Sequence, residues 1–351
     1  MTNGVYCCKM TEVKERLLDL LPDDTLDEFE VKKFLGAGLS RFARTFESKS
    51  NSAIKLFVAS DKKLAYPLLY EKFQREAEIL ELMKDSPYIM NRVTGFREFG
   101  THNETDKFAP YYVMELMEGD LDELLIDPDL TLPLISKLEI IIQIISAAID
   151  FHAKGICHRD LYTPNVLYKV SGGEIICKVA DFGSAKDIHR PQTSPYFAPT
   201  GNNSYSSPEA AVGMLGGDDV TEELMIKSDV FALGLMMYTI LSGTGARQEA
   251  LHTSIAGVVG MARQQNMYSE KTTMDQRRDF LSETAMPTLV VGYGKIVDIT
   301  ENDILEDEEL ALTLTNIIKR MLTLDYKTRT GDLTELNEEL SKIKVNLEAK
   351  S

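Results

Sequence analysis

Three oxygen-bearing side chains lie close together in the middle of the chain. Asp160 and Asn165 fall in an expected loop between a long helical segment and a short strand, and Asp181 ends the next strand. Carboxylate and amide oxygens are protein ligands that magnesium prefers, together with water and phosphate. Asn165 and Asp181 therefore predict a magnesium site, and a carboxylate at Asp160 can accept a hydroxyl proton beside it.

A lysine and a glutamate further upstream form a second candidate for chemistry. Lys55 interrupts the otherwise apolar strand segment 53–58, and Glu76 lies on the helical segment that follows. A lysine held by a carboxylate is placed to contact nucleotide phosphates. The alternative is an ordinary strand lysine that points outward to solvent.

The segment 35–41, LGAGLSR, contains a glycine-rich turn. Gly36 and Gly38 would let the backbone approach a phosphate closely, although a tight hairpin would use the same glycines. A strand-like segment follows this turn, whereas a helix follows the turn of a dinucleotide-binding fold. The sequence also has no Gly-x-x-x-x-Gly-Lys-Ser/Thr phosphate loop. These two common nucleotide-binding folds are therefore disfavoured.

The elements that must position these residues change in character near Gly119. Before it, strand-like segments and one helical segment predominate, and after it, long apolar segments predict mainly helices. The expected fold class is α+β, with a small antiparallel sheet and a larger helical part. A short amphipathic helix over residues 12–21, ended by Pro22, should precede the sheet. Strands are expected at 29–35, 41–48, 53–58, 93–99 and 111–116, and the main helices at 68–83, 134–153, 229–241 and 310–322.

The composition excludes several classes of protein. The 351 residues include 38 Lys and Arg against 55 Asp and Glu, a net charge of −17, which argues against a general nucleic-acid binder. Four cysteines without repeated spacing give neither a disulfide framework nor a zinc pattern. The apolar run 140–149 is too short to span a bilayer, and no signal-peptide segment is recognised. We expect a folded protein of the reducing cytoplasm with no membrane span.

Taken in order, the motifs resemble those of eukaryotic-type protein kinases. They are HRDLYTPN at 158–165, ADFG at 180–183, SPE at 207–209, KSDVFALG at 227–234 and LDYKTR at 324–329. The resemblance implies one bilobal catalytic domain that uses ATP and Mg²⁺ and phosphorylates a protein substrate. Its small lobe would span residues 29–117 and its large lobe 118–345, after a lead-in helix within 1–28.

The resemblance also implies a role for individual residues. Asp160 would be the catalytic base, supported by Lys55 and Asn165, while Asn165 and Asp181 would bind Mg²⁺. Glu209 would pair with Arg329, and Asp229 would anchor the hydrophobic helix of the large lobe. Asp122 is an alternative to Asp120 near the ribose. The residues implied to bind ATP are Leu35, Gly36, Ala37, Gly38, Ala43, Ala53, Lys55, Glu76, Met114, Glu115, Met117 and Asp120.

Three positions depart from the family pattern. Arg41 replaces the third glycine of the phosphate loop, and Tyr162 replaces the lysine that follows the catalytic aspartate in Ser/Thr kinases. Asn202 replaces the threonine that contacts this lysine in the family, so both partners of that contact are lost together. Tyrosine kinases also lack the lysine, but their arginine-containing catalytic loop is missing here. We therefore expect phosphate transfer to Ser or Thr.

Two other functions are compatible with these motifs. The three departures could mark a pseudokinase scaffold, although Lys55, Asp160, Asn165 and Asp181 are all retained. A small-molecule kinase shares the lobes and the metal ligands but lacks the Ser-Pro-Glu motif and its distant arginine.

The sequence leaves two further points open. Arg159 could bind a phosphate on the activation segment, and residues 242–300 have no assigned role; the possible phosphate acceptors are Thr193, Ser194, Tyr196, Thr200 and Ser204.

Overall fold

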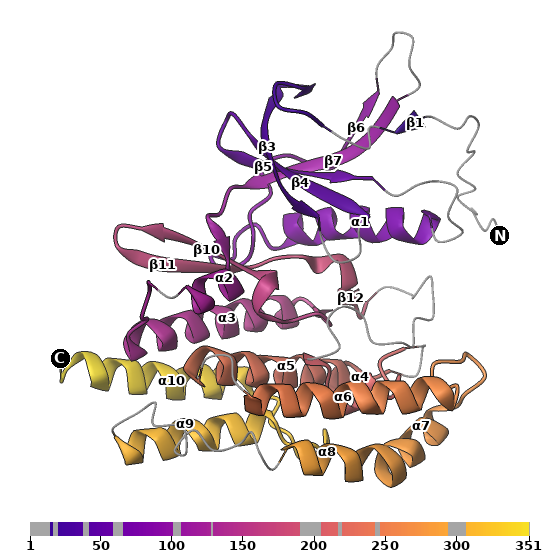
Figure 1. Cartoon of the computed structure of the whole chain (residues 1–351), viewed down its shortest axis with the longest axis vertical. Coiled ribbons are helices and arrows are strands. Elements are labelled where there is room, and N and C mark those ends of the chain that lie inside the picture. The colour runs from indigo at the N-terminus through magenta and orange to yellow at the C-terminus, as the bar shows by residue number, and fades with distance from the viewer. Residues whose placement is uncertain are drawn as a thin grey trace. The chain divides into compact units, whose positions relative to one another are not determined.

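The chain forms two compact units in a computed structural model (Figure 1). The sheet unit comprises Met1–Leu82 and Asn91–Leu116, and the helical unit comprises Met83–Met90 and Met117–Ser351. Each is described by itself. The structure describes residues 15–16, 20–37, 42–58, 66–100, 107–127, 129–189, 205–216, 220–242, 246–293 and 307–350.

The sheet unit contains a mainly antiparallel sheet and one long helix, α1 (Tyr66–Leu82). Its strands lie in the order β1-β7-β5-β4-β3-β2, and β6 pairs with β7. Among the described strands of this sheet, β1 alone runs parallel to its neighbour. The strands are β1 (Glu15–Arg16), β2 (Thr25–Leu26), β3 (Phe29–Ala37), β4 (Ala43–Ser48), β5 (Ser52–Phe57), β6 (Arg97–Gly100) and β7 (Lys107–Glu115).

The two faces of this sheet follow from the alternation of side chains along β5. Ile54 and Leu56 are fully buried in an apolar cluster on one face. Phe57 points to the opposite face, where its ring packs on Phe73 of α1 with ring centroids 5.3 Å apart. Lys55 lies on the same face as Phe57. Helix α1 therefore covers the face of the sheet that carries the predicted functional lysine.

Two expectations for this unit need correction. The helix predicted over residues 12–21 is wrong at Glu15–Arg16, which form β1 and pair with β7. The backbone groups there bond to a neighbouring strand instead of along a helix. The strand predicted at 93–99 begins only at Arg97, because the N–H groups of Val93 and Thr94 both donate to one carbonyl, that of Val113. Residues 12–14 and 17–19 lie outside the described residues.

The helical unit contains two small sheets and the longer helices of the chain. Its strands are β8 (Gly119–Asp120), β9 (Ile156–Cys157), β10 (Val166–Ser171), β11 (Glu174–Val179) and β12 (Lys186–Asp187). Its α-helices are α2 (Leu121–Ile126), α3 (Leu134–Ala153), α4 (Pro208–Ala211), α5 (Glu222–Ser242), α6 (Ala246–Gln264), α7 (Met274–Phe280), α8 (Met286–Tyr293), α9 (Glu308–Met321) and α10 (Leu333–Glu348). Short 3-10 turns η1 (Thr163–Asn165) and η2 (Phe182–Ser184) and a π-helical turn η4 (Leu281–Ala285) complete it.

The segment Met83–Met90 belongs to the helical unit, which the sequence did not indicate. The Met90 N–H donates to the Val179 carbonyl over 3.0 Å, and the Val179 N–H donates to the Tyr88 carbonyl over 2.9 Å. These two bonds add the segment alongside β11. They are backbone contacts between distant parts of the chain, and side-chain types give no signal of them.

Helix α5 is the core of the helical unit and contacts both α3 and α9 (Figure 1). It is the one described helix that is long and apolar enough to cross a membrane, but 94% of its apolar window is buried in the protein. Such burial is typical of the central helix of a folded domain. The other apolar candidate, α3, buries one face and is followed by β9 and then by the loop that carries Asp160.

A glycine allows α5 and α9 to approach each other closely. A Cβ atom added at Gly234 would lie 2.8 Å from Cδ2 of Leu322 and 2.9 Å from Cβ of Met321. We expect Gly234→Ala to lower the free energy of unfolding by about 1–3 kcal/mol, because the two helices must move apart. The measurement is urea-induced unfolding.

The matched control is Gly257→Ala on α6. Gly257 is exposed, and no other part of the described chain lies within 4 Å of its Cβ position. Alanine loses less backbone entropy than glycine in a helix, so this variant should gain about 0.5–1 kcal/mol. A Gly234→Ala protein as stable as the wild type would contradict the close approach of α5 and α9.

Candidate active site

The loop that carries Asp160 is fixed to α5 by one buried carboxylate. Asp229 accepts hydrogen bonds from the backbone N–H groups of His158 and Arg159 over 2.8 and 2.9 Å. Its Oδ2 also lies 3.0 Å from Nε2 of His152 at the end of α3. The predicted anchoring role of Asp229 is therefore seen as direct bonds to the two residues that precede Asp160.

Asn165 connects Asp160 to the strand that ends at Asp181. Its side-chain Nδ2 donates to the backbone carbonyl of Asp160 over 2.8 Å. The backbone carbonyl of Asn165 accepts the N–H of Ala180, the residue directly before Asp181, over 2.8 Å. The three residues predicted from the sequence are therefore brought together. Because the amide nitrogen bonds inward, the amide oxygen of Asn165 is the atom left to serve as a ligand.

Two residues beside this cluster have left-handed backbone conformations. Arg159 has φ 66° and Asp181 has φ 59°, and residues other than glycine rarely adopt this backbone region. Each such residue costs about 1–3 kcal/mol and persists only where surrounding contacts fix it. Arg159 directly precedes the candidate base, and Asp181 is itself a candidate metal ligand. The strain therefore marks the same place as the side-chain chemistry.

Phe182, directly after Asp181, is buried between aromatic rings of the helical unit. Its ring centroid lies 5.8 Å from that of Phe151 and 4.6 Å from that of His158. His158 Nε2 lies 3.0 Å from the Ala180 carbonyl. Burial lowers the pKa of His158, so its ring is neutral and Nε2–H is the donor to this carbonyl. These contacts fix the backbone on both sides of Asp181.

The predicted lysine–glutamate pair is confirmed within the sheet unit. Lys55 Nζ lies 2.7 Å from Glu76 Oε1, with side chains 13% and 2% exposed. Glu76 lies on the same buried stripe of α1 as Phe73, Ala77 and Leu80, which explains how a carboxylate reaches the sheet. Because the salt bridge is largely shielded from water, it holds the lysine ammonium in one place.

Strand register places four of the predicted nucleotide-binding residues on one face of the sheet. Ala43 pairs with Phe57, and Ala53 pairs with Met114, so both pairs share the face that carries Lys55. Glu115 is partly engaged elsewhere, because its backbone N–H donates to the Asn91 carbonyl over 3.0 Å. Leu35, Gly36 and Ala37 lie at the end of β3, and Gly38 lies outside the described residues.

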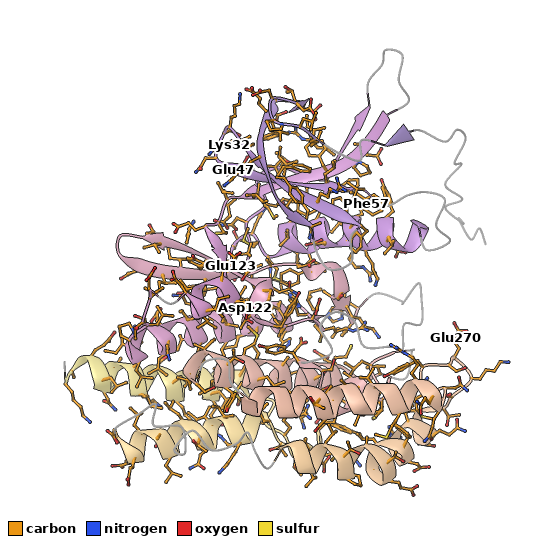
Figure 2. The ribbon with its side chains drawn as sticks, viewed as in Figure 1. Lys32, Glu47, Phe57, Asp122, Glu123 and Glu270 are labelled. Carbon is orange, nitrogen blue, oxygen red and sulfur yellow. The ribbon has the colours of Figure 1, made fainter. Side chains whose placement is uncertain are left out.

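The structure separates the roles of the two aspartates proposed for the ribose. Asp120 caps α2, where its Oδ1 accepts the N–H of Glu123 over 2.9 Å, and burial raises its pKa. Asp122 instead accepts a hydrogen bond from the Thr163 hydroxyl over 2.8 Å, which ties α2 to η1. Figure 2 labels Asp122 and Glu123 on this helix. No sequence pattern predicted the bond between Asp122 and Thr163. Met117 lies just before β8 and Asp120.

Glu209 and Arg329 form the predicted distant pair. Arg329 donates to both carboxylate oxygens of Glu209, over 2.6 and 3.1 Å, and both side chains are 0% exposed. The guanidinium also donates to the carbonyls of Thr323 and Lys227. It lies over the ring of Phe231 at 4.8 Å from the centroid. This pair joins α4 to α5 and to the segment before α10.

One further cluster has the residue types of a metal site. Ligand atoms of His152, Cys157 and Asp229 lie within 4.8 Å of one another. Both Asp229 oxygens already accept hydrogen bonds, and burial raises the pKa of the Cys157 thiol, which keeps it protonated. Metal ligation needs the thiolate. We therefore interpret this cluster as part of the anchor of the catalytic loop.

Several sequence predictions fall on residues that the structure does not describe. These are Arg41 and Asn202, and the activation-segment hydroxyls of Thr193, Ser194, Tyr196, Thr200 and Ser204.

Comparison with known proteins identifies the family. The sequence profile of the protein kinase domain matches residues 29–340. The chain belongs to the protein kinase family, and its antiparallel-sheet unit followed by a helical unit is the α+β fold of that family.

The chain is similar to several protein kinases over part of their length. It is 30% identical over 232 residues to serine/threonine-protein kinase A of Synechocystis, covering 62% of this chain and 41% of that protein. It is 28% identical over 223 residues to serine/threonine-protein kinase PLK4 of Nematostella vectensis, covering 63% of this chain and 21% of that protein. The ovarian-specific serine/threonine-protein kinase Lok of Drosophila melanogaster is 25% identical over 308 residues, which cover 87% of this chain and 61% of that protein.

Proposed function

We propose that this protein transfers the γ-phosphate of ATP to Ser or Thr hydroxyls of a protein substrate, with Asp160 as the catalytic base. The observation that carries the proposal is the position of Asn165. Its side-chain nitrogen donates to the Asp160 backbone carbonyl. Its backbone carbonyl accepts the N–H of Ala180, the residue before Asp181. The proposed base Asp160 and the proposed ligand Asn165 therefore lie on one fixed loop, next to the end of β11 that leads to the second proposed ligand, Asp181.

The residues present fit the group that this reaction needs. One amide oxygen and one carboxylate, from Asn165 and Asp181, suit Mg²⁺, which keeps water and phosphate as its other ligands. When bound, Mg²⁺ neutralises charge on the phosphates. Lys55, held by Glu76, would contact the α- and β-phosphates through its ammonium group. Asp160 would accept the hydroxyl proton as the acceptor oxygen bonds to the γ-phosphorus and the bond to ADP breaks.

Two observations favour this reaction over the alternatives. A pseudokinase scaffold would not need Lys55 and Glu76 to be held as a shielded pair. A small-molecule kinase lacks the pairing of Glu209 with Arg329, which is buried here. The relatives reported above are all named as serine/threonine-protein kinases, which supports transfer to Ser or Thr.

The proposal extends to substrate charge and compartment. A net charge of −17 favours a basic protein or peptide as the acceptor. A reducing cytoplasm is the compartment we propose, and the free thiols of Cys157 and Cys177 are compatible with it.

The test is a phosphate-transfer assay on the purified full chain. The protein would be incubated with γ-labelled ATP, Mg²⁺ and matched peptides that present Ser, Thr or Tyr in basic or acidic surroundings. We expect label on Ser or Thr of the basic peptides and none after chelation of Mg²⁺. Label on tyrosine alone would contradict the proposed specificity, and label on small alcohols alone would favour the small-molecule kinase.

A further inference from the structure

Tyr162 is the least expected residue of the catalytic loop. It lies two residues after Asp160, where the family resemblance leads one to expect a lysine. The tyrosine is only 7% exposed. Its ring packs against that of Tyr205, with centroids 6.1 Å apart and planes inclined by 52°. An aromatic contact therefore occupies the place of a cationic side chain.

Tyr205 begins the closing segment, which we define as residues 205–211. This segment contains Ser207, whose Oγ accepts the N–H of Ala210 at the start of α4 and lies 2.8 Å from Oγ of Ser228 on α5. The Tyr205 hydroxyl lies 3.3 Å from Oγ1 of Thr239, also on α5. The closing segment is therefore attached to α5 at two points.

The catalytic loop is attached to the same helix, through Asp229. Asp229 and Thr239 are ten residues apart on α5, which corresponds to about 15 Å along a helix axis. The ring contact between Tyr162 and Tyr205 joins the two attached segments to each other. Loop, closing segment and helix thus form one closed series of contacts that fixes their spacing.

The position of this contact relates it to the acceptor. A hydroxyl that gives its proton to Asp160 must come within hydrogen-bonding distance of that carboxylate. A segment that packs on Tyr162 lies beside the approach to Asp160. Burial, and then the carboxylates of Asp160 and Asp181, raise the pKa of Tyr162, so the side chain stays neutral. It can therefore act through its ring and its O–H group, and it supplies no charge.

We infer that Tyr162 is a positioning residue for the protein acceptor. The Tyr162 ring holds the closing segment at a fixed distance from Asp160. The inference rests on the proposed function and deepens it. In this role the ring matters, and the hydroxyl does not. The contact contributes to binding of the acceptor and leaves ATP binding unchanged.

The experiment compares Tyr162→Phe, Tyr162→Ala, Tyr205→Ala and the double alanine variant. Aromatic pairs contribute an amount that corresponds to about 2- to 12-fold in an equilibrium constant. We expect Tyr162→Ala to raise the KM for a peptide acceptor by about that factor, with the KM for ATP unchanged. Tyr162→Phe should stay within about twofold of the wild type. The KM of the double variant for the peptide should be no higher than that of the poorer single variant, because each single substitution already removes the same ring contact.

A second measurement separates this inference from the proposed function. Amide hydrogen exchange of residues 205–211 should become faster in Tyr162→Ala and stay unchanged in Tyr162→Phe, whether or not the protein transfers phosphate. Leu314→Ala on α9, a fully buried position outside the site, serves as a destabilised control with unchanged KM values.

Three results would overturn the inference. The first is a Tyr162→Phe protein as impaired as Tyr162→Ala, which would assign the effect to the hydroxyl. The second is additive effects of Tyr162→Ala and Tyr205→Ala. The third is equal changes in the KM for ATP and for the peptide. Absence of phosphate transfer by the wild type would contradict the proposed function, and the exchange measurement would still test the contact.

Discussion

Replacing Asp160 by asparagine is expected to lower kcat for phosphate transfer by about 10²- to 10⁴-fold, the usual contribution of a general base. Asparagine has the shape of aspartate but cannot take the proton of the acceptor hydroxyl. The bond from Asn165 to this residue uses the Asp160 backbone carbonyl, so the variant keeps it. The loop and the two candidate metal ligands should therefore stay in place.

This prediction is checked by steady-state kinetics together with binding of ATP and Mg²⁺ by calorimetry. Nucleotide affinity should stay within a few-fold of the wild type, which separates loss of chemistry from loss of binding. Glu270→Gln, an exposed position after α6 labelled in Figure 2, is the matched control for loss of one negative charge. Unchanged phosphate transfer in Asp160→Asn would exclude Asp160 as the base.

Replacing Arg329 by methionine is expected to lower the free energy of unfolding by about 3–5 kcal/mol, as is typical when one partner of a buried ion pair is removed. Glu209 would be left as a buried carboxylate without its bidentate partner. The carbonyls of Thr323 and Lys227 would each lose a donor as well. Methionine fills a similar volume, so the loss reports mainly on charge and hydrogen bonding.

The control is the same substitution at an exposed ion pair. Arg278 lies 2.9 Å from Asp275, with side chains 52% and 85% exposed. Arg278→Met should cost less than about 1 kcal/mol, because water screens such pairs. Adding Glu209→Gln to Arg329→Met should recover part of the stability, since no buried charge then remains unpaired. Equal losses from the two arginine substitutions would contradict a structural role of the buried pair.

Much of the fold could be predicted from local patterns. The strands around Lys55, helix α1 and the helices α3 and α9 lie close to their predicted ranges, because alternation and helical spacing are properties of neighbouring residues. The segment 12–21 shows the limit of this method. Its helical spacing was real, yet Glu15–Arg16 pair with a strand about ninety residues away.

The candidate site could be predicted by residue type and order but not by geometry. The motifs were sufficient to name Asp160, Asn165 and Asp181, and the pairs of Lys55 with Glu76 and of Glu209 with Arg329. Each role in the site requires a particular chemical group, and the amino-acid sequence identifies these groups directly. The sequence pattern suggested Lys55 and Glu76 as partners, whereas Glu209 and Arg329 could be predicted as partners only from the family resemblance.

The tertiary structure alone decided how these groups are held. The orientation of the Asn165 amide, the three bonds to Asp229 and the contact of Tyr162 with Tyr205 depend on backbone positions set by distant elements. His158 and Asp229 are 71 residues apart, and each could have found other polar partners nearby. The sequence by itself determined the chemical groups of this kinase and their order. Long-range packing around α5 determined their spacing, because that spacing depends on buried contacts among segments that local sequence patterns do not relate.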